Sequence, residues 1–210
     1  MRSGVLTMVA LTALVLLVAC GNPATNKSQA VTGEATQASS PKPAGAQNYS
    51  ITPENSKIEF VGSKVTGSHN GSFQKFAGEI HYTGDVTTSH VTITMDSDSL
   101  TTDTPDLTKH LKTADFFDVA KYPQAKFEST AIKPGGDKGA SHTITGNLTL
   151  HGVTKSVTFP ATIAAAPDAV TVDSSFSINR KDFGINYAGA ADNLIRDDVV
   201  LTLKIKATKA

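Results

Sequence analysis

The sequence predicts an all-β protein, a single antiparallel barrel or sandwich with one short inserted helix. About eight segments alternate apolar and polar side chains with the period of two that is typical of strands with one buried face. Stretches rich in glycine, serine and asparagine separate these segments at hairpin spacing. Only one segment carries a convincing helical pattern. A chain of this length can bury a sizeable core in one domain.

The clearest pair of strands spans 141–163, S-H-T-I-T-G-N-L-T-L-H-G-V-T-K-S-V-T-F-P-A-T-I. Apolar residues alternate with threonine, serine and asparagine on both arms, so one face is apolar and the other is rich in hydroxyl groups. His151 and Gly152 lie between the arms, where glycine can adopt the positive φ of a tight turn. This pattern predicts a hairpin, which indicates a fold class but no ligand.

The remaining strands and the helix follow in order along the chain. We expect a turn at T-G-S-H-N-G (66–71) between the first two strands. A helix is predicted over 105–113, because Thr104 suits the N-cap, Pro105 the first helical position and Asp106 the positive end of the helix dipole. One face of this helix suits a position across a barrel mouth or a sheet edge. The other predicted strands are 56–64, 72–83, 89–97, 124–133, 170–179 and 199–208.

The amino-acid composition does not indicate a strongly charged partner. The 210 residues include 19 basic and 19 acidic side chains, and no basic stripe is present. Nucleic-acid-binding proteins usually carry a basic excess or a clustered basic patch, so we expect no nucleic-acid partner.

The first twenty residues predict export and a lipid anchor. Arg2 precedes an apolar run over 5–19 that is too short for a transmembrane helix and fits a signal-peptide core. The run ends in Leu-Val-Ala-Cys-Gly, which resembles a bacterial lipobox with Cys20 as the first mature and acylated residue. Several acyl chains on Cys20 would anchor the protein stably to a membrane of the cell envelope. Because Cys20 is the only cysteine, the domain must fold without a disulfide.

The segment from Gly21 to Asn48 has almost no large apolar residues and predicts a flexible linker. The predicted organisation is therefore a lipoprotein signal peptide over 1–19, an acylated cysteine and linker over 20–48, and a barrel domain over 49–210.

Five ordered segments between about Tyr49 and Thr208 resemble the YceI-like family of exported, lipocalin-like barrels. The segment K-V-T-G-S-H-N-G (64–71) departs from the commonest pattern, being longer and more polar. If this loop forms part of a barrel mouth, we expect the head group of the ligand to differ. The segments that carry the resemblance are T-P-E-N-S-K-I-E-F (52–60), G-S-F-Q-K-F-A-G-E-I (71–80), H-L-K-T-A-D-F-F-D-V-A-K-Y-P-Q-A-K-F-E-S-T (110–130), G-N-L-T-L-H-G-V-T-K-S-V (146–157) and I-N-R-K-D-F-G-I (178–185).

The resemblance implies an antiparallel eight-stranded lipocalin-like barrel whose apolar channel holds a polyisoprenoid or similar long-chain lipid, with no catalysis and no cofactor. The residue pattern alone leaves open whether the inward side chains line a channel or fill a solid core. Arg180, in N-R-K-D-F-G, is expected to tie a strand end to a turn, with a head-group contact as the alternative. The candidate ligand-binding residues are Phe60, Val91, Ile93, Met95, Phe127, Ile144, Leu148, Phe159, Phe176, Ile178 and Arg180.

Motifs for metal binding or catalysis are absent from the sequence. The six histidines form no H-x-H or H-E-x-x-H pair and fall on different predicted elements. There is no G-x-S-x-G motif, and Asp115 and Asp118 fit solvated or capping roles better than acid–base work. The sequence therefore predicts neither a metal site nor a catalytic site.

The favoured hypothesis is a non-enzymatic lipoprotein that sequesters or carries an isoprenoid or a quinone-like lipid in the bacterial envelope. The helix over 105–113 and the loop over 64–72 are its candidate gates. The main alternative is a structural or adhesion module with a solidly packed barrel, and an envelope enzyme is a weaker third. The sequence is also compatible with a homodimer.

Overall fold

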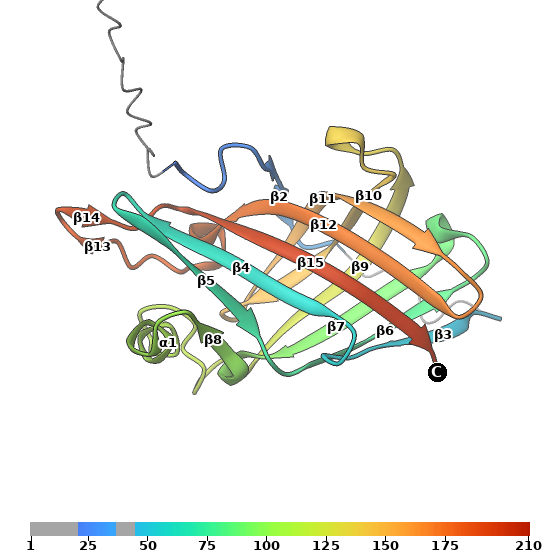
Figure 1. The fold of residues 1–210 in the computed structure, drawn as a ribbon, viewed down its shortest axis with the longest axis horizontal. Helices are drawn as coiled ribbons and strands as arrows, with labels where there is room; N and C mark the ends of the chain where they lie inside the picture. The colour runs from blue at the N-terminus through green and yellow to red at the C-terminus, as the bar shows by residue number, and fades with distance from the viewer. Residues whose placement is uncertain (1–20, 37–44) are drawn as a thin grey trace, which may run out of the picture.

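The computed structural model describes residues 21–36 and 45–210, and its main feature is a closed antiparallel barrel of eight long strands (Figure 1). Three of the long strands are interrupted, so each of these consists of two shorter labelled strands. The ring closes because β12 pairs with β15 as well as with β11. In chain order the strands are β3 (Gln47–Ile51) with β4 (Lys57–Lys64), β5 (Gly67–Phe73) with β6 (Phe76–Tyr82), β7 (His90–Asp96) with β8 (Leu100–Thr102), β9 (Gln124–Pro134), β10 (His142–Leu150), β11 (Val153–Ala165), β12 (Ala169–Asn179) and β15 (Asp198–Lys209).

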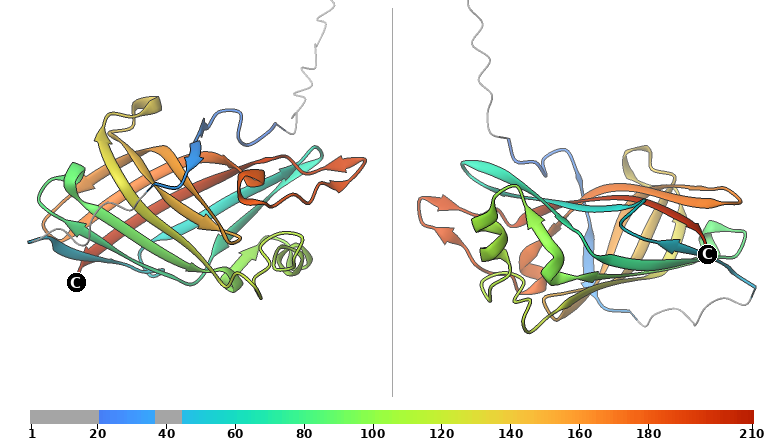
Figure 2. Two further views of the ribbon diagram at one scale, coloured as in Figure 1. Left: turned by 180° about the vertical axis from the view of Figure 1, so that it is seen from behind. Right: turned by 60° about the horizontal axis from the view of Figure 1, so that its bottom comes forward.

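Consecutive long strands are neighbours around the barrel, so it has an up-and-down topology (Figures 1 and 2). The alternation along each strand places one set of side chains inside and the other outside. On β15, for example, Leu201 and Leu203 point inward while the intervening Thr202 and Lys204 belong to the outer face. The prediction of an eight-stranded antiparallel barrel with one short helix is confirmed.

The turn predicted over 66–71 is wrong in extent. His69 and Asn70 are strand residues of β5 that pair with β4, and the connection between the two strands consists of Val65 and Thr66. The close packing of Phe60 over Gly71 helps to explain why the pairing extends so far. A Cβ atom on Gly71 would lie 2.2 Å from the tip of the Phe60 ring, so a glycine leaves room for this ring. The strand predicted over 72–83 is interrupted at residues 74 and 75.

The predicted helix is present as α1 (Pro105–Leu111), with Pro105 in the first turn and Leu111 buried. Thr104 has the extended backbone of an N-cap, but its side chain makes no capping hydrogen bond. Short 3₁₀ turns and one small hairpin complete the connections. These are η1 (Val86–Thr88), η2 (Ser97–Ser99), η3 (Asp137–Gly139), η4 (Arg180–Phe183), β13 (Gly189–Ala190) and β14 (Asn193–Leu194).

The flexible linker predicted over 20–48 is wrong for residues 28–34. This segment forms β1 (Ser28–Gln29) and β2 (Val31–Glu34), which pair with β12 and β11 respectively (Figure 2). Backbone hydrogen bonds to the barrel wall order these residues although they have few large apolar side chains. The leader predicted over 1–19 and Cys20 lie outside the described residues.

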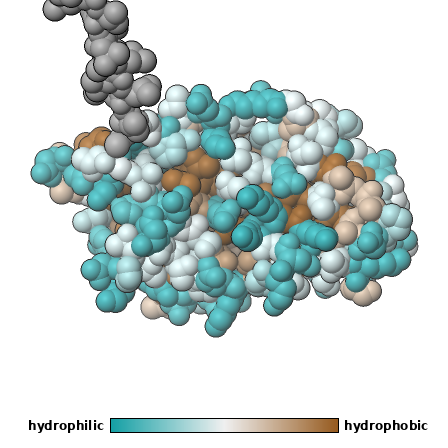
Figure 3. All heavy atoms as spheres, in the orientation of Figure 1, coloured by the Kyte–Doolittle hydropathy of each residue, from teal (hydrophilic) through white to brown (hydrophobic). Residues whose placement is uncertain are grey.

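The outer surface in the view of Figure 3 is largely hydrophilic or neutral, with hydrophobic side chains confined to separate patches. Most buried apolar residues form a single cluster inside the barrel. Across residues 21–36 and 45–210, no helix has the length and apolar character needed to cross a membrane.

Candidate functional site

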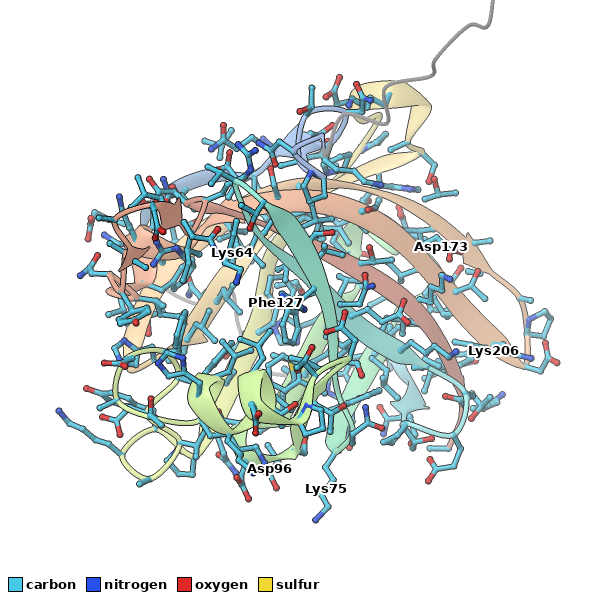
Figure 4. The ribbon with its side chains drawn as sticks, turned by 60° about the vertical axis from the view of Figure 1, so that its left-hand side comes forward. Lys64, Lys75, Asp96, Phe127, Asp173 and Lys206 are labelled. Atoms are coloured by element: carbon cyan, nitrogen blue, oxygen red, sulfur yellow. The ribbon has the colours of Figure 1, made fainter. Side chains whose placement is uncertain are left out.

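A cavity of about 640 Å³ occupies the interior of the barrel. At one end it reaches Ile51 and Ile80, and at the other it reaches Leu107 of α1 and Tyr187. Figure 4 looks toward the α1 end, where Lys64 and Phe127 are seen in the opening between α1 and the strands. A well-packed interior has few voids larger than a water molecule, so this barrel is not solidly filled. The volume falls within the range of about 300–1,000 Å³ that is usual for small-molecule sites.

All eleven candidate ligand-binding residues line this one cavity. They come from six of the eight long strands and from η4, and the period-2 pattern directs the side chains of the strand residues inward. Ten of them are apolar, and they belong to an apolar lining that other strand residues extend. The residues brought together are Phe60, Val91, Ile93, Met95, Phe127, Ile144, Leu148, Phe159, Phe176, Ile178 and Arg180.

The aromatic rings of the lining are in mutual contact. The Phe159 and Phe176 rings are stacked, with centroids 4.2 Å apart, and Phe127 packs against Phe159 at 5.7 Å. Nearer α1, Phe60 and Phe73 have centroids 6.0 Å apart. The cavity therefore presents carbon surface along most of its length, which suits a hydrocarbon ligand.

Arg180 is a wall residue whose guanidinium is largely used within the fold. It is 4% exposed. Its Nε donates to the Arg196 carbonyl at 3.1 Å and one terminal nitrogen donates to the Ile185 carbonyl at 2.7 Å. The other terminal nitrogen lies 3.4 Å from a carboxylate oxygen of Asp197. Burial lowers the pKa of Arg180, and the Asp197 carboxylate opposes that effect. These contacts correspond to the expected structural role, a strand end tied to the following loop.

Three polar side chains lie together near the cavity mouth, and the sequence pattern did not predict them as site residues. Lys64, Ser63 and Arg196 line the cavity, and the Arg196 backbone N–H donates to the Ser63 carbonyl at 2.9 Å. The Ser63 hydroxyl and the Arg196 Nε are buried without a hydrogen-bond partner among the described residues. Leaving such groups unpaired in the protein interior costs free energy. We call these three residues the mouth cluster.

The charged side chains that line the cavity are all basic. Among the described residues, those that line the cavity include no Asp or Glu, whereas Lys64, Arg180 and Arg196 all reach it. This asymmetry is local, because the whole chain has equal numbers of acidic and basic side chains. The unusual polarity of the 64–71 segment was the sequence signal closest to the mouth cluster. Arg196 carried no signal, because its position depends on the hairpin formed by β13 and β14.

The histidines are distributed over several parts of the barrel. His69 and His110 line the mouth, and each is paired with an aspartate, Asp103 at 2.9 Å and Asp115 at 2.8 Å. The His110 ring also contacts Tyr187, with centroids 5.1 Å apart. In the described part of the chain, no three His, Cys, Asp or Glu residues are arranged to hold a metal ion.

The fold and the cavity define a class of protein, a lipocalin-like barrel with an internal apolar site. Residues 49–207 match the model of the YceI-like domain. The chain therefore belongs to the YceI-like family.

Individual relatives support this assignment. A UPF0312 protein of Pseudomonas putida (strain W619) is 36% identical over 137 residues, which cover 62% of this chain and 70% of the relative. The crystal structure of BcnA from Burkholderia cenocepacia is 26% identical, covers 75% of this chain and 99% of its own, and superposes with a TM-score of 0.67.

A second solved structure, described as a polyisoprenoid binding domain from Saccharophagus degradans, shares the fold. It is 15% identical, covers 79% of this chain and 99% of its own, and has a TM-score of 0.62.

Proposed function

We propose that this protein binds a long-chain isoprenoid lipid, such as a polyprenyl derivative or an isoprenoid quinone, and sequesters or carries it in the bacterial cell envelope without changing it chemically. The observation that carries the proposal is the cavity of about 640 Å³ enclosed by apolar side chains. The relationship to a polyisoprenoid binding domain supports the same choice of ligand.

Burial provides the affinity in this proposal. Each methylene moved from water into an apolar site contributes roughly 0.8 kcal/mol. A branched prenyl chain has many such groups and a slender shape that suits a narrow barrel interior. The inward faces supply the surface, and the stacked Phe159 and Phe176 rings form its middle section.

The head group would lie at the mouth cluster. Lys64 and Arg196 line the cavity and provide positive charge and N–H donors. Oxygen acceptors satisfy such donors, and an anionic oxygen does so with charge-assisted hydrogen bonds. A phosphate-bearing isoprenoid therefore fits this mouth better than a neutral quinone, although both carry acceptors.

The location in the envelope rests on the first twenty residues. The signal-like run over 5–19 and the lipobox at Cys20 support export followed by acylation, which would hold the barrel at a membrane surface. Mass spectrometry of the mature N-terminus tests this part of the proposal. An unmodified chain that retains residues 1–19 would contradict it.

The binding proposal is tested by purifying the full chain from its own host without denaturation, followed by organic extraction and mass spectrometry. A near-stoichiometric isoprenoid is the expected result and would identify the ligand. An empty protein that also takes up neither added quinone nor added polyprenol would overturn the proposal. The structural module with no ligand would then be the better account.

A further inference from the structure

The barrel wall is split along part of the seam between β11 and β12. The two strands pair directly only through residues 162–165 and 170–173, whereas β12 pairs with β15 along its whole length. Pro160 helps to account for the split, because proline has no N–H to donate to a strand ladder. The Ser174 hydroxyl donates to the Pro160 carbonyl at 2.6 Å where the direct ladder ends.

Residues 28–34, which we call the strap, occupy this split. Ser28 and Gln29 pair in parallel with β12, and Val31 to Glu34 pair in antiparallel with β11. Between them, the Ala30 N–H donates to the Ser177 carbonyl at 2.8 Å. The strap therefore supplies strand pairing to both sides of the seam, in the way that an added strand completes an exposed sheet edge.

Short ladders and surface contacts hold the strap in place. It forms two residue pairs with β12 and four with β11, compared with eleven between β12 and β15. Thr32 donates to Asp182 at 2.6 Å and Lys155 donates to Glu34 at 2.8 Å. Val31 is 70% exposed, and the buried side chains of the strap, Ser28 and Ala30, are small. Segments with few buried contacts and exposed backbone pairing open at a lower free-energy cost than core strands.

The apolar cavity lies directly behind the seam. Val157 and Phe159 on β11 and Phe176 and Ile178 on β12 line the cavity on the two sides of the split. No strap residue contributes to that lining. If the strap moved away, the stacked Phe159 and Phe176 rings would be the main remaining barrier between the cavity and solvent at this point.

We propose that the seam between β11 and β12 is a lateral entrance for the hydrocarbon chain of the ligand, and that the strap is the strand that closes it. This inference rests on the proposed function and adds a second route to the cavity beside the mouth near α1. A prenyl chain can slide sideways between two apolar strand faces without bringing its whole length through the narrow mouth. Closure by the strap then slows the escape of the bound chain.

The position of the strap in the sequence supports this role. It lies outside residues 49–207, the part that matches the family model, so it is an addition to the matched barrel. Cys20 precedes Ser28 by only eight residues, which span at most about 29 Å when fully extended. An acylated Cys20 would therefore keep the proposed entrance close to the bilayer from which a lipid is taken.

The test locks the strap with a disulfide. Val31 and Thr158 are directly paired, so V31C/T158C joins the strap to β11 in the full chain, with Cys20→Ser to prevent other pairings. The matched control is T149C/T154C, also with Cys20→Ser, which joins directly paired residues of β10 and β11 and does not tether the strap. Each protein is loaded with geranylgeraniol, and release into phosphatidylcholine vesicles is followed by mass spectrometry in the oxidised and the reduced forms.

The expected result is that oxidation slows release from V31C/T158C several-fold and leaves release from T149C/T154C unchanged. A Thr32→Val variant, which loses the hydrogen bond to Asp182, is expected to release the probe faster. Equal release rates from oxidised and reduced V31C/T158C would overturn the lateral entrance while leaving the proposed function intact. Failure of every form, including the unmodified chain, to take up geranylgeraniol would overturn the proposed function and this inference together.

Discussion

The rings of Phe159 and Phe176 lie nearly parallel, with centroids 4.2 Å apart and 9° between their planes, across a seam where their strands are not directly paired. Other ring pairs in the cavity are tilted, such as Phe127 and Phe159 at 57°. The stack thus joins β11 to β12 through side chains at the position where the strap joins them through backbone. Wall closure and cavity lining depend on the same two residues.

A charge placed inside the cavity should abolish lipid binding. Leu148 points into the cavity and is 8% exposed, whereas the neighbouring Thr149 belongs to the outer face of β10. We expect Leu148→Arg to lose uptake of geranylgeraniol, because a buried guanidinium without a partner is strongly unfavourable beside hydrocarbon. Native mass spectrometry measures the uptake, and circular dichroism checks the fold.

Thr149→Arg is the matched control and should bind as the unmodified protein does. Full binding by a folded Leu148→Arg variant would contradict the assignment of the cavity as the lipid site.

Removing positive charge from the mouth cluster should weaken binding of anionic lipids selectively. Lys64→Gln and Arg196→Gln each take away a cation that lines the cavity. Hydrogen bonds to charged groups contribute about 1.5–3 kcal/mol, so we expect a loss of roughly 10- to 100-fold in affinity for a polyprenyl phosphate. Affinity for the polyprenol of the same length should change little.

Titration calorimetry in detergent measures both affinities. Lys206→Gln is the control, since Lys206 is exposed on the outside of β15 (Figure 4). Equal losses for the phosphate and the alcohol would argue against a head-group role for the mouth cluster.

The strand pattern was predictable because it is local. Alternation along a strand determines which side chains face inward, and the ten apolar candidate residues were placed on the cavity side by that rule. Arg180 was instead a candidate because of the N-R-K-D-F-G motif. The strap was not predictable in the same way, because residues 28–34 are held by backbone pairing to strands more than a hundred residues away. The mouth cluster joins Ser63 and Lys64 to the distant Arg196, and no local pattern indicates that contact.

Close packing of an aromatic ring over glycine should make Gly146 intolerant of a side chain. A Cβ at this position would lie 2.4 Å from the Phe127 ring and 2.6 Å from the Glu128 carbonyl oxygen. The carbonyl belongs to the backbone of β9 and cannot turn aside. We expect Gly146→Ala to lower the free energy of unfolding by about 1–3 kcal/mol, measured by urea denaturation.

Gly62→Ala is the control, because a Cβ on Gly62 meets nothing within 4 Å. It should be neutral or slightly stabilising. A Gly146→Ala protein as stable as Gly62→Ala would show that β9 and β10 separate more easily than the structure indicates.

The stability of the barrel should fall on mild acidification because of His90. Both ring nitrogens of His90 are buried without a hydrogen-bond partner, and the ring stacks on His81 with centroids 6.2 Å apart. Burial is the main cause that lowers the pKa of His90 below its usual 6.5. The charges facing it act in both directions, since Glu128 raises the pKa while His81 and Lys126 lower it.

The direction of the pH effect follows from the lowered pKa. Below about pH 6.5 the unfolded chain binds a proton at His90 that the folded protein binds only at lower pH. The contribution of His90 to the free energy of unfolding is therefore complete above the pKa that His90 has in the unfolded chain. It is lost as the pH falls toward the lower pKa that His90 has in the folded protein. We expect the urea midpoint to decrease between about pH 7.5 and pH 5, and the decrease to be smaller in His90→Leu. His142→Gln, a change at another histidine of the wall, should keep the full decrease, and an identical pH dependence in His90→Leu would exclude His90 as its source.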